Sequence, residues 1–77
     1  MLSFELKKPS PGETANEIEI FLDQDGLKSL LSQLKFLQDG RTEHIHLMAE
    51  SWGGELLSEK PQDPENTSIR HVKVFLR

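Results

Sequence analysis

The sequence predicts an α+β domain in which a mainly antiparallel sheet of four to five strands carries one amphipathic helix on one face, in the order β-β-α-β-β-β. Four short segments alternate apolar and polar residues with the period of a strand, and a fifth is a short apolar run. One further segment repeats leucines at intervals of three and four, the period of a helix. With 77 residues, the chain has the length of a single small domain spanning residues 1–77.

The first two strands are expected at residues 2–7 and 17–22. In the first, Leu2, Phe4 and Leu6 alternate with polar residues, and the prolines and glycine at 9–12 end the strand. In the second, Ile18, Ile20 and Leu22 form one face. The two segments are expected to pair as a hairpin with a long loop.

The helix is predicted at roughly residues 24–39. Asp23 is positioned to cap its first turn, and Gly40 stands where a helix C-terminus commonly ends. The apolar stripe faces the core, and it consists of Leu27, Leu30, Leu31, Leu34 and Leu37.

The second half of the chain contains the remaining strands. Residues 43–49 alternate, and a turn centred on Trp52, Gly53 and Gly54 leads into a short apolar stretch at 55–58. These two segments are predicted to pair as a hairpin. Residues 60–68 are polar, contain two prolines, and are expected to form a solvated loop before the last strand at 69–76.

A single helix covers only one face of the sheet. We expect the most aliphatic strand faces to lie under it, namely Leu2, Phe4, Leu6, Ile18, Ile20, Leu22, Ile45, Leu47, Val72, Val74 and Leu76. The uncovered face then carries an apolar and imidazole-rich set consisting of Phe21, Met48, Ile69, Phe75, His44, His46 and His71.

This uncovered face is larger than the apolar patch that a small monomer usually exposes. Either a partner or a second copy contacts it, or a segment of the chain folds over it, such as the loop at 59–68 or Trp52. Trp52 itself is either an interface anchor or a lid on a small core. The candidate partner-binding residues are Trp52, Phe21, Met48, Phe75, His44, His46 and His71.

Composition narrows the function classes. The chain has no cysteine, which excludes disulfides, thiolate zinc sites and cysteine nucleophiles. Its formal charge of −4 argues against nonspecific binding of nucleic acid and suits a basic protein partner. Neither a signal peptide nor a membrane span is readable, so the expected location is the cytoplasm.

The sequence contains no catalytic motif, and we expect no enzyme activity and no cofactor. No serine lies in a G-x-S-x-G setting. Asp23–Gly26 resembles the start of a calcium loop but lacks the later glutamate, so capping is the preferred interpretation. His44 and His46 are spaced to share a metal if His71 lies on a neighbouring strand, but without carboxylate or cysteine signals no metal is predicted.

Two runs of residues resemble a known family: IEIFLDQDGLKSLLSQLKFL and HIHLMAESWGGELLSE. They are similar to the small immunity proteins of bacterial polymorphic toxin systems, in particular to the family catalogued as immunity protein thirty-two, over residues 17–76. The resemblance implies a non-catalytic cytoplasmic antitoxin that binds and blocks a toxin domain encoded beside it. It assigns no individual toxin-binding residue. The alternative is a small homodimeric structural or regulatory domain.

Overall fold

The computed structural model describes residues 1–77 as one α-helix and five strands in two antiparallel sheets, which confirms the predicted α+β class and element order. No helix is long and apolar enough to cross a bilayer. The elements are β1 (Leu2–Leu6), β2 (Ile18–Leu22), α1 (Gln24–Gln38), β3 (His44–Met48), the 3₁₀ turn η1 (Glu50–Trp52), β4 (Thr67–Ile69) and β5 (His71–Phe75).

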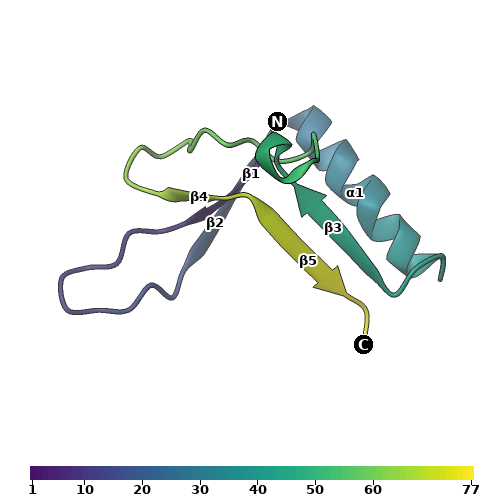
Figure 1. Ribbon diagram of the computed structural model, residues 1–77, viewed down its shortest axis with the longest axis horizontal. Coiled ribbons are helices and arrows are strands. Elements are labelled where there is room, and N and C mark those ends of the chain that lie inside the picture. Colours follow the sequence, from purple (N-terminus) through teal and green to yellow (C-terminus); the bar gives the residue numbers. More distant parts are fainter.

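The two sheets form two arms that diverge from a common apex (Figure 1). The first sheet has the strand order β2-β1-β4, and the second contains β3 and β5. The expected last strand at 69–76 is therefore divided at Arg70, whose carbonyl accepts the Ala49 N–H at 2.8 Å. Because β4 pairs with β1 and β5 pairs with β3, the chain changes partners at this residue.

The predicted hairpin between residues 43–49 and 55–58 is wrong. After β3, the helical turn η1 redirects the chain, and Leu57 forms an isolated parallel bridge with Ala49. The carbonyl of Met48 accepts the Leu56 and Leu57 N–H groups, each at 3.1 Å. A Cβ at Gly54 would lie 2.6 Å from that carbonyl oxygen, so this tight return requires glycine.

Helix α1 begins as predicted. The side chain of Asp23 accepts the Gly26 N–H at 2.8 Å and so caps the first turn. Gly26 is buried, and a Cβ there would lie 1.7 Å from the carbonyl oxygen of Met1. A side chain at residue 26 would therefore push β1 away from the start of the helix.

The core lies where the two sheets and the helix meet. It consists of a buried aliphatic cluster with partly buried neighbours around it. The buried members are Leu2, Leu37, Ile45, Leu47, Ala49 and Leu57, and Phe4, Leu30, Leu56, Val72 and Val74 pack against them.

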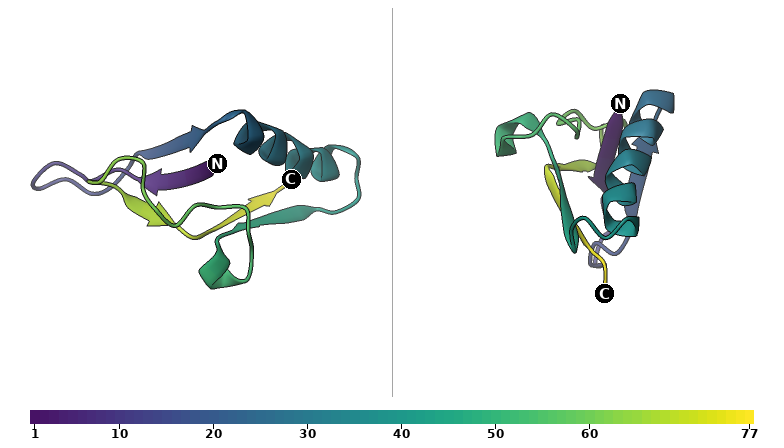
Figure 2. Two further views of the ribbon diagram at one scale, coloured as in Figure 1. Left: turned by 90° about the horizontal axis from the view of Figure 1, so that it is seen from above. Right: turned by 90° about the vertical axis from the view of Figure 1, so that its right-hand side faces the viewer.

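The helix covers less of the aliphatic face than expected. Ile18 and Ile20 of β2 are 55% and 51% exposed, and Leu22, Leu31, Leu34 and Leu76 are exposed as well. The reason is the connection: only Asp23 separates β2 from α1, so the helix leads away from the strand instead of folding back over it (Figure 2). Much of the first sheet is left without a helix over it.

The opposite face of β1 is covered by the loop at 59–66, in accordance with the expected alternative of self-coverage. Glu5 is fully buried and accepts hydrogen bonds from the N–H groups of Gln62 (2.7 Å) and Asp63 (3.2 Å), the Asn66 amide (3.1 Å) and the Ser3 hydroxyl. Burial alone raises the pKa of Glu5, but these donors outweigh it and hold the pKa below its ordinary value of 4.5. A buried carboxylate thus fastens the loop to the sheet.

We expect Leu47→Ala to lower the free energy of unfolding by about 2 to 5 kcal/mol, because Leu47 is completely buried in the core. Leu34→Ala removes the same atoms from a side chain that is 38% exposed, and we expect a loss of about 1 kcal/mol or less. Urea unfolding of both variants measures the difference. Equal losses would contradict the placement of the core.

We expect Glu5→Gln to lower the free energy of unfolding by about 1.5 to 3 kcal/mol, because the amide replaces a charged acceptor with a group that also donates. The folded pKa of Glu5 lies below its unfolded value, so its stabilising effect is present above the unfolded pKa and is lost as pH falls through the folded pKa. Unfolding titrations between pH 7 and pH 3 should show a smaller loss with acid in the variant. The matched control is Glu13→Gln, at an exposed position of the β1–β2 loop; an identical response of both variants would refute the role of Glu5.

Candidate functional site

Five rings form a contiguous row on the outer face of the second sheet, which we call the aromatic row. Ring centroids are 5.2 Å apart between Trp52 and His71, 5.2 Å between His71 and His46, 5.0 Å between His46 and His44, and 5.4 Å between His44 and Phe75. The guanidinium of Arg77 extends it at 5.0 Å from the Phe75 ring centroid.

The register of β3 and β5 creates this row. His44 is opposite Phe75, His46 is opposite Lys73, and Met48 is opposite His71. Residues directly opposite in an antiparallel pair point to the same face, so all six side chains share it, while Ile45 and Leu47 turn inward to the core. The 3₁₀ turn η1 then brings Trp52 to the end of the row.

The aromatic row is open to solvent. Trp52 is 57% exposed and Phe75 is 47% exposed; His46 is also exposed, and His44, Met48 and His71 are partly buried. Trp52 packs against His71 with the ring planes tilted by 40° and is absent from the core cluster, so it does not act as a lid on the core. The loop at 59–66 lies against β1, in the other sheet. Coverage by the chain itself, one of the two expected alternatives, therefore applies to the polar face of β1 in the first sheet. The aromatic row on the second sheet is left open.

Two residues expected on this surface lie in the other sheet. Ile69 is opposite Phe4 and so belongs to the aliphatic face, contrary to its expected position. Phe21 is opposite Ser3, on the face that contains Glu5, and is partly buried. The single-sheet prediction placed them beside Phe75 because alternation defines faces within a strand and does not reveal that the last strand breaks at Arg70.

His46 occupies the centre of the row. Its Nδ1 lies 2.9 Å from Nε2 of His71, a hydrogen bond that requires at least one of the rings to be neutral. Partial desolvation of its ring by the packed neighbours, followed by the nearby charges of His44, His71 and Lys73, lowers the pKa of His46 below 6.5. The charged form of the His46 ring is therefore less favoured than that of a free imidazole. No group of three or more side chains has the arrangement of a metal site.

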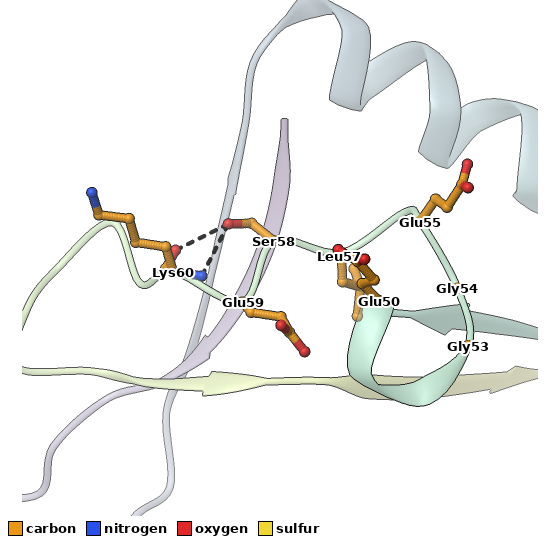
Figure 3. A pocket seen from close by; sticks show the side chains of 8 residues that line it. All are labelled: Glu50, Gly53, Gly54, Glu55, Leu57, Ser58, Glu59 and Lys60. Carbon is orange, nitrogen blue, oxygen red and sulfur yellow. Dashed lines mark hydrogen bonds between the residues drawn. The ribbon is translucent and has the colours of Figure 1, made fainter.

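A shallow, open depression of about 730 Å³ lies next to η1 (Figure 3). Leu57 is its one apolar side chain, and three glutamates line it: Glu50, Glu55 and Glu59. Glu59 accepts the Ser51 N–H at 3.1 Å, and hydrogen bonds from Ser51 lower its pKa. Sequence reasoning missed this acidic rim, because its glutamates are four or five residues apart in the chain and gather only when the chain returns after η1.

Comparison with known proteins adds a decisive observation. The family model of Immunity protein 32 matches residues 17–70, which is more than half of the chain. The chain belongs to the Immunity protein 32 family. The matched region of this immunity protein includes His44, His46 and Trp52 and ends before His71 and Phe75. No curated protein and no solved structure matches it.

We expect His46 to titrate below pH 6.5 and below its own value in the His71→Ala variant. Removing His71 takes away both a burying ring and a nearby positive charge, so the pKa of His46 should rise. Histidine ring-proton shifts in NMR spectra, recorded between pH 8 and pH 4, measure both values. An unchanged pKa of His46 in His71→Ala would show that the two rings do not interact in solution.

Proposed function

We propose that this immunity protein binds a toxin domain encoded by the neighbouring gene and blocks it through the aromatic row. The observation that supports the proposal is the exposed, contiguous set of rings on β3, β5 and η1 in a member of an immunity protein family. Binding energy in protein interfaces is concentrated in a few aromatic and arginine side chains. Trp52, Phe75 and Arg77 provide such side chains on one surface.

The geometry of the row suits an interface anchor. Each ring contacts the next, so little side-chain entropy remains to be lost when a partner binds. The β3–β5 ladder beneath the rings is held by the core through Ile45 and Leu47. A partner therefore meets a surface already close to its bound conformation.

Charge favours a basic toxin surface. The chain has a formal charge of −4, and the acidic depression beside η1 lies next to Trp52. Lys73 and Arg77 are the positive groups at the row itself, so the complementary toxin surface is expected to be apolar opposite the rings and basic opposite the glutamates. Complementarity of this kind accelerates association in addition to favouring the correct partner.

The proposed mechanism is occlusion without catalysis in the cytoplasm. The depression contains carboxylates and the Ser58 hydroxyl, which donates to the Lys60 carbonyl at 3.1 Å rather than to a base. The His46–His71 contact joins two imidazoles on an open surface. A protein of this kind inhibits by covering the toxin, so one bound copy inactivates one toxin molecule.

We expect Trp52→Ala and Phe75→Glu each to weaken toxin binding by about 2 kcal/mol or more, which is about 30-fold in Kd. Both side chains are largely exposed, so the melting temperature should change little. Isothermal titration calorimetry with the purified toxin domain measures affinity, and survival of cells expressing the toxin measures protection.

The control is Phe36→Ala, which removes an exposed ring from α1 on another surface. It should leave toxin affinity unchanged. Wild-type affinity in both Trp52→Ala and Phe75→Glu would refute the aromatic row as the binding surface. No binding of the wild-type protein to the toxin domain would refute the proposed function itself.

A further inference from the structure

Strand β2 is an unprotected edge of the first sheet. In the order β2-β1-β4 it has one neighbour, β1, and its other side is free. Exposed edges are usually protected by proline, lysine or a bulge, and residues 18–22 contain neither proline nor lysine and pair continuously with β1. Ile18, Ile20 and Leu22 are all exposed.

The hydrogen bonds show which peptide groups of β2 are free. Lys7 N–H donates to the Glu17 carbonyl at 3.0 Å, and Asp23 N–H donates to the Met1 carbonyl at 3.1 Å. Hydrogen-bonded and non-hydrogen-bonded pairs alternate in an antiparallel ladder, so Glu19 and Phe21 also direct their backbone groups toward β1. The N–H and C=O groups of Ile18, Ile20 and Leu22 consequently point outward, away from the sheet.

We propose that β2 pairs with β2 of a second copy of this chain, antiparallel and centred on Ile20. In this register Ile20 lies opposite Ile20 of the copy, and Ile18 lies opposite Leu22. Each of these pairs satisfies the outward-pointing backbone groups of both strands. The aliphatic face of each sheet then continues across the two-fold axis into the other copy.

The side chains at the centre of the strand favour the same register. Between the hydrogen-bonded pairs, Glu19 lies opposite Phe21 of the copy, so no like charges meet there. The Glu19 carboxylate also accepts a hydrogen bond from the Asn66 amide at 3.0 Å within its own chain. A shift of two residues toward the N-terminus would place Glu19 opposite Glu19, which is unfavourable. At the ends, Glu17 lies opposite Asp23 of the copy, and this like-charge contact is offset within each copy. Glu17 is paired with Lys7 Nζ at 3.5 Å, and Asp23 is paired with the N-terminal ammonium group.

The second sheet has two edge strands, β3 and β5, and neither suits self-pairing as well as β2. In β3 the Met48 carbonyl already accepts the Leu56 and Leu57 N–H groups, each at 3.1 Å, so one end of that edge is occupied. In β5 the bonds from Ala49 N–H to the Arg70 carbonyl and from Leu76 N–H to the Glu43 carbonyl show that His71, Lys73 and Phe75 point their backbone groups outward. A two-fold pair centred on this strand would place Lys73 opposite Lys73. Strand β4 has three residues and offers a shorter ladder.

The helix leaves the β2 edge accessible. Helix α1 begins after Asp23 and extends beyond the end of β2 (Figure 2). In an antiparallel pair the helix of the copy would lie at the opposite end of the joint sheet. The aromatic row is on β3, β5 and η1, so self-association at β2 leaves it free to bind a partner.

The experiment measures self-association of the full chain without toxin, so that its outcome is independent of the proposed function. Sedimentation equilibrium should show a mass that rises with concentration from 8.8 kDa toward twice that value. Ile20→Lys, which places two like charges on the axis, should remain at the monomer mass. Because Ile20 is half exposed, circular dichroism should show this variant folded. The matched control Leu76→Lys changes an exposed residue outside both surfaces and should dimerise as the wild type does.

Amide hydrogen exchange of the wild-type protein tests the register without any substitution. Protection of the Ile18, Ile20 and Leu22 amides should rise about 10-fold between dilute and concentrated samples, whereas Glu19 and Phe21, bonded to β1, should be protected in both. A wild-type protein that stays monomeric at millimolar concentration would overturn the proposal. So would dimerisation that Ile20→Lys leaves intact, or protection of these amides only when toxin is added.

Discussion

The division of the last strand between two partners determines the form of this protein. Residues 67–69 pair with β1 and residues 71–75 pair with β3, with Arg70 between them. Because one stretch of chain serves two sheets, the sheets diverge into two arms (Figure 1). The core extends from Leu2 in β1 to Leu37 and Ile45, between α1 and the second sheet. Both exposed surfaces follow from this constraint: the aromatic row on one arm and the β2 edge on the other.

The sequence predicted the elements better than their partners. The leucine repeat and Asp23 located α1 to within a residue, and alternation correctly placed His44, His46 and Phe75 on one face. Alternation describes one strand at a time, so it could not show that Ile69 belongs with Phe4 in a different sheet. The glycines at 53 and 54 favoured a hairpin, but the helical turn before them reversed the direction of return.

The burial of polar and apolar groups also differs from the pattern that strand periodicity suggests. Glu5 lies on the polar side of β1, which the sequence assigns to solvent, yet it is fully buried because the loop at 59–66 supplies backbone N–H groups to its carboxylate. Ile18 and Ile20 lie on the apolar side of β2 and remain exposed because no helix covers them. Whether a side chain on either face of a strand is buried depends on contacts with residues far apart in the chain. The local alternation of residues contains no information about those contacts. The proposed function, binding of a toxin domain, needs such exposed surfaces more than it needs a deep pocket.

The position of β1 has a consequence for synthesis on the ribosome. Strand β1 pairs with β4 along one edge, and the carboxylate of Glu5 accepts hydrogen bonds from the backbone N–H groups of residues 62 and 63. Contacts between such distant residues form late, because a long stretch of chain must be ordered before they stabilise the fold. The nascent chain therefore cannot assemble its first sheet until residues 62–69 have emerged from the exit tunnel, and β3 waits for residues 71–75. The aromatic row needs both β3 and β5, so it is complete only once residues 71–75 are available for pairing.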